Sequence, residues 1–233
     1  MAHIAMIRNT VRRARMLALV VLGCAAMFTS AAALAQNGGQ FNDNPALRPP
    51  AGARVAIVEF DDMQCPACAQ ANPILIQAAA KYKIPWLRHD FIIPYHTWSR
   101  NAALRARWFD TQKKGLGDQY RNEVFANQSN IYSRNMLAEF TSQFAKKHGI
   151  ALPFALDPEG KLAAGIETDV NLGHQIGIHQ TPTIFIVTND PQKPYLWVRN
   201  PEQDLYRTID QALTISHPVA KERASRGKSG KRR

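Results

Sequence analysis

The chain has 233 residues, which is enough for one or two domains with a substantial core. Its formal net charge of +11 is concentrated at the two ends: residues 1–35 hold four arginines and no acid, and residues 221–233 hold seven Lys or Arg and one Glu. Residues 36–220 are close to neutral in balance, so we expect no nucleic-acid partner.

Residues 1–35 have the three parts of a secretory signal. Basic residues come first, an apolar stretch covers 16–28, and Ala33-Leu34-Ala35 forms a cleavage site of the A-x-A type. The apolar stretch is shorter than the roughly 20 residues that a membrane-spanning helix needs. We therefore predict a soluble exported protein, periplasmic or otherwise outside the cytoplasm, that begins at Gln36. A lipid anchor at Cys24 is the alternative, because Val21-Leu22-Gly23-Cys24 resembles a lipoprotein cleavage box.

A leader and a β-α-β unit follow. Residues 36–53 are rich in Asn, Gly and Pro, which predicts a flexible leader. The apolar run 54–60 predicts a buried strand, and residues 66–82 predict a helix with Pro66 in its first turn, where a missing N–H costs nothing. A second strand is expected over 86–93, between two prolines.

Beyond residue 94 the apolar residues recur at helical spacing, and strand character returns near residue 183. The expected helices cover 98–109, 116–124, 137–144, 158–166 and 201–213, and the expected strands cover 183–187 and 195–198. The order is β-α-β, a helical block, then β-β-α, which predicts an α/β fold. The basic end of the chain, 217–233, is expected to be disordered, since it lacks apolar residues large enough to anchor it.

Two cysteines remain after export, and both lie where a strand is expected to run into a helix. They form Cys65-Pro66-Ala67-Cys68. A thiolate is the nucleophile in disulfide exchange. A helix N-terminus offers unpaired N–H groups and the positive end of the helix dipole, which favour a Cys65 thiolate. We predict Cys65 as the nucleophile and Cys68, one turn later, as the resolving cysteine that closes a Cys65–Cys68 disulfide.

Three other interpretations of the pair remain open. A zinc half-site would need two further ligands, and the mature chain has no second cysteine pair. A purely structural disulfide between cysteines so close in sequence would constrain little chain entropy. A buried, unreactive thiol pair is unusual in an exported chain. Redox use is favoured, with no metal and no cofactor.

From about Arg54 to Leu213 the chain resembles the DsbA-like thiol–disulfide oxidoreductases of the thioredoxin superfamily. The resemblance is carried by Glu59-Phe60, by Cys65-Pro66-Ala67-Cys68 and by Thr181-Pro182-Thr183 just before a strand. The helical block is similar in size to the insertion that separates this family from plain thioredoxins. The resemblance implies an α/β thioredoxin fold with an inserted helical domain. Its thioredoxin-like domain would cover 54–94 and 178–216, and its helical insertion 95–177.

The resemblance also implies where substrate is held. Pro182 would be the cis-proline that packs against the two cysteines. Thr181 would offer backbone groups to an extended substrate, and Pro66 and Ala67 would contact it as well. The residues alone leave open an ordinary trans-proline at the start of a strand.

Glu59 lies six residues before Cys65, where the resembled family carries a buried acid beneath the site. Burial should raise the pKa of Glu59 and let it exchange protons with Cys68. The other possibility is an acid on an edge strand in water.

Four further residues near the motif bear on its chemistry. Asp61 and Asp62 are predicted to be solvated loop acids whose charge opposes the thiolate. His179 could face the site, but a surface position is favoured. Ala67 departs from the resembled family, whose strong oxidants carry His before the second cysteine. This departure puts the oxidising strength in doubt.

The chain is thus expected to exchange disulfides with reduced or unfolded protein substrates. We expect a monomer that a membrane redox partner recycles. The short leader leaves no room for a dimerisation domain of the kind that dimeric isomerases carry, which favours an oxidase. A reductase or isomerase remains an alternative, and so does a non-catalytic binding protein whose cysteines form a stable clasp.

Overall fold

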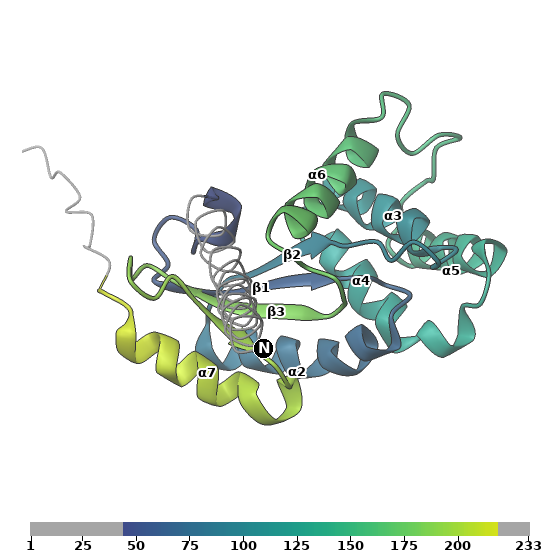
Figure 1. Ribbon diagram of the computed structural model, residues 1–233. Coiled ribbons are helices and arrows are strands. Elements are labelled where there is room, and N and C mark those ends of the chain that lie inside the picture. The colour runs from purple at the N-terminus through teal and green to yellow at the C-terminus, as the bar shows by residue number, and fades with distance from the viewer. Residues whose placement is uncertain (1–43, 219–233) are drawn as a thin grey trace, which may run out of the picture.

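The computed structural model describes residues 44–218, in which four strands form one sheet (Figure 1). The strands lie in the order β2-β1-β3-β4, with β1 and β2 parallel and the other neighbours antiparallel. Their bounds are Val55–Asp61 for β1, Trp86–Asp90 for β2, Thr183–Thr188 for β3 and Tyr195–Val198 for β4. A parallel pair needs a crossover, and α2 (Pro66–Tyr82) supplies it.

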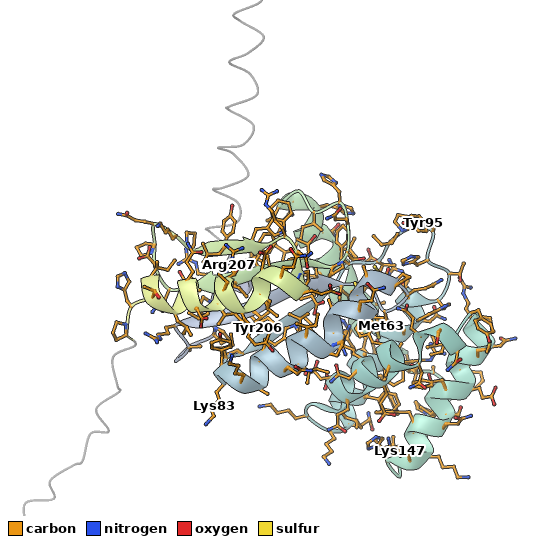
Figure 2. The ribbon with its side chains drawn as sticks, turned by 90° about the horizontal axis from the view of Figure 1, so that it is seen from below. Met63, Lys83, Tyr95, Lys147, Tyr206 and Arg207 are labelled. Carbon is orange, nitrogen blue, oxygen red and sulfur yellow. The ribbon has the colours of Figure 1, made fainter. Side chains whose placement is uncertain are left out.

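Helices cover both faces of the sheet (Figure 1). α2 and α7 (Pro201–Ile215) pack on one face, and α6 (Lys161–Gln175) lies on the other. Figure 2 shows α2 and α7 side by side from below, with Tyr206 on α7. β1 is buried along its whole length because it lies between two strands and two helical layers, which confirms the predicted buried strand.

Between β2 and β3 the chain forms a block of helices. They are α3 (Ser99–Gln112), α4 (Leu116–Ala126), the short 3-10 helix η2 (Gln128–Asn130), α5 (Arg134–Lys147) and α6. The predicted apolar stripes meet in one core, in which the rings of Phe109, Tyr120 and Phe144 contact one another with centroids 4.8 to 5.1 Å apart. The predicted α/β fold with an inserted helical block is confirmed.

Two element bounds differ from the prediction for local reasons. β2 ends at Asp90 and not at residue 93, because the N–H of Ile93 donates to the Asp62 carboxylate (2.8 Å) and the chain leaves the sheet. α6 begins at Lys161 and not at residue 158, because the Asp157 carboxylate accepts two N–H groups of the first helical turn from outside the helix.

Part of the expected flexible leader is tied down. The 3-10 helix η1 (Pro45–Leu47) places Leu47 in the core on the α6 face, with 1% of its surface exposed. A single apolar residue has no periodicity, so the sequence pattern did not indicate this contact. The predicted signal segment, the alternative anchor at Cys24 and the tail beyond residue 218 lie outside the described residues. Within residues 44–218, no helix combines the length and the hydropathy that crossing a membrane requires.

Candidate active site

The two cysteines lie where β1 leads into α2, as predicted. The helix begins at Pro66, so Cys65 is its N-cap residue, and both cysteines are free thiols. The Cys65 thiol donates to the backbone carbonyl of Thr181, with 3.2 Å between Sγ and O. The hydrogen bond with Cys68 is the main cause that lowers the pKa of Cys65 to about 5. Burial opposes this shift, and the side chain of Thr181 and the first N–H groups of the helix add to it, because they stabilise the thiolate.

Cys68 is fully buried one turn into the helix. Burial raises the pKa of its thiol well above the usual range, and the hydrogen bond to Cys65 and the charge of Glu59 raise it further. The two thiols are therefore unequal: near neutral pH Cys65 is largely an anion, while Cys68 keeps its proton. The assignment of Cys65 as nucleophile and Cys68 as resolving cysteine stays a prediction, and a thiolate beside a protonated thiol is what these two roles require.

The loop before β3 faces the cysteines from the other side of the site. Its Thr181–Pro182 peptide bond is cis, as the resemblance implied. The Thr183 hydroxyl donates to the Gln180 carbonyl (2.8 Å), which closes the loop and directs the Thr181 carbonyl toward Cys65. Residues far apart in the sequence thus meet at one thiol.

Glu59 lies in the central strand β1 with 1% of its surface exposed, so it is not an acid on an edge strand in water. The Trp86 indole N–H donates to its Oε2 atom at 3.1 Å, and Arg88 Nε lies 3.9 Å from the same atom. Burial raises the pKa of Glu59 to about 8, and the charge of Asp61 adds to the shift. Glu59 therefore carries a proton near neutral pH, and its charge influences the titration of Cys68.

The prediction that Asp61 is a solvated loop acid is wrong. Asp61 is the last residue of β1 and has 1% of its surface exposed. Its carboxylate lies 3.5 Å from the Arg121 guanidinium of α4 and 3.9 Å from that of Arg88 of β2. Burial raises the pKa of Asp61 to about 6 against the effect of both arginines. The local sequence could not show this, because α4 covers Asp61 from a distant part of the chain.

The prediction that Asp62 is solvated is also wrong. It is buried, and its carboxylate accepts the backbone N–H groups of Gln64 (2.7 Å) and Ile93 (2.8 Å). These bonds shape the turn that precedes Cys65 and join it to the segment after β2. Asp62 is therefore a structural residue of the turn.

The helical insertion holds the turn that carries the cysteines. The Gln128 side-chain amide of η2 donates to the carbonyls of Met63 (2.9 Å) and Cys65 (3.0 Å). The Gln64 side chain accepts the backbone N–H of Trp98 at 2.8 Å. The sequence did not indicate a role for Gln64 or Gln128, because a single amide side chain in a loop belongs to no recognisable pattern.

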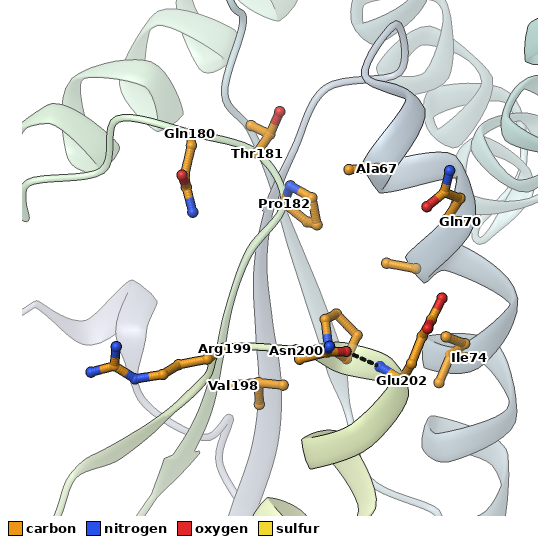
Figure 3. Close-up of a pocket in the computed structure, with 12 residues that line it drawn as sticks. Ala67, Gln70, Ile74, Gln180, Thr181, Pro182, Val198, Arg199, Asn200 and Glu202 are labelled. Atoms are coloured by element: carbon orange, nitrogen blue, oxygen red, sulfur yellow. Dashed lines mark hydrogen bonds between the residues drawn. The ribbon is translucent and has the colours of Figure 1, made fainter.

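A groove of about 470 Å³ runs beside the cis-proline, between α2 and the start of α7 (Figure 3). Ala67 and Pro182 line the end near the cysteines, and Val198 and Glu202 line the other end. Further lining side chains are those of Gln70, Ile74, Gln180, Arg199 and Asn200. The groove mixes apolar and polar side chains from separate segments, so no local sequence pattern predicts it.

The remaining sequence candidates lie at the surface. Pro66 and Ala67 are exposed at the start of α2, and His179 is exposed as favoured. Over residues 44–218, no three His, Cys, Asp or Glu side chains are placed together so that they could hold a metal ion.

The sheet, the cis-proline loop and the helix that starts after a cysteine define the thioredoxin class. A family model described as thioredoxin matches residues 50–194, which is more than half of the chain. The chain therefore belongs to the thioredoxin family. No curated protein sequence matches it.

Solved structures with a similar fold include a DsbA protein. BdbD from Bacillus subtilis in its oxidised form is 21% identical with a TM-score of 0.56, over 72% of this chain and 89% of that one. The thiol-disulfide exchange protein alpha-DsbA2 from Wolbachia pipientis is 18% identical with a TM-score of 0.58, over 80% and 97%. A periplasmic thioredoxin-like protein from Salmonella enterica serovar Typhimurium is 21% identical with a TM-score of 0.57, over 76% and 96%. These likenesses confirm the DsbA-like thioredoxin fold with its inserted helical region.

Proposed function

We propose that this chain is an exported thiol–disulfide oxidoreductase that oxidises reduced protein substrates through Cys65 and Cys68. The unequal pair carries the proposal, because a cysteine with a pKa of about 5 beside a buried thiol of raised pKa suits disulfide exchange. One protein of similar fold is described as a thiol-disulfide exchange protein, which supports the same reaction class here.

The oxidising direction follows from the stability of the Cys65 thiolate. Interactions that stabilise this anion favour the dithiol form, so the disulfide becomes a better electron acceptor. Ala67 supplies no side-chain donor at the position where strong oxidants of the family carry His. We therefore expect a reduction potential between the limits of about −120 mV for a strong oxidant and about −270 mV for a reductant.

The proposed reaction has two exchanges. A substrate thiolate attacks Cys65 Sγ, the Cys65–Cys68 bond breaks, and its electron pair stays on Cys68, which takes up a proton from Glu59. A second substrate thiolate then attacks the substrate sulfur of the mixed disulfide, and Cys65 leaves as a stabilised thiolate. The substrate loses two electrons in forming its disulfide, and the cysteine pair gains them.

The groove beside Pro182 is the proposed contact for substrate. An extended polypeptide could bond to the backbone of Thr181, with Pro66 and Ala67 beside the attacked sulfur. We further propose that the protein acts as a monomer in the periplasm, where the similar Salmonella protein is located. A membrane redox partner would accept the two electrons and restore the disulfide.

The test is oxidation of a reduced, unfolded model protein by the purified disulfide form, together with the reduction potential of the pair. We expect oxidation faster than an equal concentration of oxidised glutathione, and loss of that activity in Cys65→Ser. Substitution of the exposed Ser142 by Ala is the matched control and should change nothing. A potential at the thioredoxin limit would indicate a reductase or isomerase. No catalysis at all would support the binding-clasp alternative.

A further inference from the structure

Asp61 is a buried carboxylate that lacks hydrogen bonds. It follows Glu59 by two residues in β1, so both side chains point to the same face of the sheet. Neither carboxylate oxygen of Asp61 accepts a hydrogen bond from any described residue. Buried carboxylates are normally hydrogen-bonded, so this exception asks for a functional explanation.

Two arginines connect Asp61 to Glu59 and to a second cavity. Arg88 Nε lies 3.9 Å from both Asp61 Oδ2 and Glu59 Oε2, and Arg121 Nη1 lies 3.5 Å from Asp61 Oδ1. Arg88 Nε and Nη1 are also buried without hydrogen-bond partners among the described residues. Both arginines line a cavity of about 580 Å³ on the β2 side of the molecule, and Asp118 forms part of its wall. A polar cavity of this size can hold water.

The neighbouring buried acids Asp90 and Asp62 already accept hydrogen bonds. Asp90 accepts one hydrogen bond from Arg107 and one from Arg121, each at 2.6 Å. Asp62 accepts two backbone N–H groups. A carboxylate held in this way is poorly placed to gain and lose a proton, which leaves Asp61 as the available acid beside Glu59.

We propose that Asp61 passes protons between Glu59 and water in the second cavity, so that the proton used by Cys68 crosses the β2 side of the sheet and not the substrate face. This inference rests on the proposed thiol–disulfide function. Asp61 acts through Glu59 and is a positioning residue, since it does not touch the reacting sulfurs. The arrangement keeps the proton path open while a substrate covers Cys65.

The proton balance is simple. When a thiolate opens the disulfide, Cys68 leaves with the electron pair and takes the proton of Glu59. Glu59 is then a buried carboxylate. Asp61 takes a proton from water that reaches it past Arg88 and Arg121, which line the cavity, and passes this proton to Glu59. The net change is one proton removed from solvent for each disulfide opened.

The groups that face Asp61 come from four elements. They are Glu59 and Asp62 on the same strand or just after it, Arg88 and Asp90 on β2, Arg121 on α4 and Cys68 on α2. Burial raises the pKa of Asp61 to about 6 and that of Glu59 to about 8. Both acids thus titrate near neutral pH, as a proton path there requires.

The experiment follows disulfide opening and proton uptake together. The oxidised full chain is mixed with excess dithiothreitol, which is reducing enough to keep the disulfide open. The ultraviolet absorbance of the released Cys65 thiolate reports the opening, and a pH-indicator dye in weak buffer, corrected for the protons that dithiothreitol itself releases, reports the uptake. We expect the two signals to coincide in the native protein. In Asp61→Asn the uptake should lag behind the opening by about tenfold or more.

Three further variants complete the test. Asp61→Ser should lag in the same way, and Asp61→Glu should restore coincident signals. Asp118→Asn removes an exposed carboxylate from the same cavity wall and should leave the signals coincident. A smaller uptake without a lag in Asp61→Asn would mean that Asp61 acts only through its charge, and a lag of equal size in Asp118→Asn would also overturn the proposal. Failure of the native disulfide to react at all would instead refute the proposed function.

Discussion

At the scale of single residues, the site depends on the different surroundings of two identical side chains. Cys65 sits at the helix N-terminus and receives hydrogen bonds, whereas Cys68 lies one turn deeper and receives mainly the cost of burial. Hydrogen bonds lower the pKa of Cys65, whereas burial raises the pKa of Cys68, so the two thiol pKa values move in opposite directions. The chemistry is thus set by where the helix begins.

We predict that Cys65 is the faster-reacting thiol of the reduced protein. Its pKa of about 5 makes it a thiolate at about pH 6, where ordinary thiols are protonated. Sub-stoichiometric alkylation at that pH, followed by mapping of the label, should find Cys65 modified at least about tenfold more than Cys68. The Cys65→Ser variant should label slowly at its remaining cysteine. Preferential labelling of Cys68 in the native protein would contradict the assignment.

The raised pKa of Glu59 predicts that the stability of the protein depends on pH. Its pKa is about 8 when folded and 4.5 when unperturbed, so the folded state binds the extra proton between these values. The contribution of Glu59 to the free energy of unfolding is therefore highest below about pH 4.5 and is lost as the pH rises through about 8.

Glu59→Gln removes this loss. We expect the stability of the variant relative to the native protein to be higher at about pH 8.5 than at about pH 5, by on the order of 2 kcal/mol. Urea unfolding at both pH values measures the change. Glu202→Gln, which alters an exposed carboxylate on α7, serves as control and should show no comparable trend. Equal differences at both pH values for Glu59→Gln would show that the carboxyl group titrates as it does in water.

At the scale of elements, the sequence was sufficient where a pattern is local. The strand before Cys65, the helix that begins at Pro66 and the strand after Pro182 all follow from runs of apolar residues bounded by turn residues. Asn200 caps α7, because its side chain accepts the N–H of Glu202 at 3.0 Å.

The sequence was insufficient where the contact is long-range. Asp61 and Asp62 look like loop acids because nothing within a few residues pairs with them, and their partners come from α4, β2 and the segment after β2. The groove beside Pro182 was not predicted for the same reason, because its lining residues Gln70 and Arg199 come together only when the sheet forms. Tertiary packing decides such positions, and one sequence carries no record of it.

The position of Pro182 in the loop before β3 leads to a further prediction. Pro182 has no N–H, so no backbone donor competes for the sulfurs beside it. Pro182→Thr adds a donor next to the Thr181 carbonyl that already contacts Cys65. A bond from this N–H to a sulfur should slow release of substrate, and mixed disulfides should accumulate several-fold over the native protein. Non-reducing gels of the variant after reaction with a reduced protein measure this, and Pro191→Thr in an exposed turn is the control. Equal amounts of complex in the two variants would contradict the proposed contact.

At the scale of the whole molecule, buried charges join the sheet to the helical insertion. Arg121 of α4 contacts Asp90 at 2.6 Å and Asp61 at 3.5 Å, and Arg107 of α3 joins Asp90 to Asp169 of α6, each at 2.6 Å. These groups lie between the parts that the sequence predicted as separate domains. Ions so placed depend on each other, since each lone charge would be costly in the interior. The sheet and the insertion should therefore unfold together.

Arg121→Met tests this coupling. The variant keeps most of the side-chain volume but removes one of the two cations beside each of two buried acids, Asp61 and Asp90, and we expect a loss of about 3–5 kcal/mol of stability. Lys147→Met on α5 removes the exposed ion-pair partner of Glu123, which lies on α4 as Arg121 does, and should cost less than about 1 kcal/mol. Urea unfolding followed by far-UV circular dichroism and by tryptophan fluorescence measures both.

Trp98 and Trp108 lie at or within α3, and Trp86 and Trp197 lie in the sheet, so the fluorescence samples both parts. The two probes should give one coincident transition in the native protein. A native transition that splits in two would show that the insertion folds by itself, and the buried charges would then be a docking surface between independent domains.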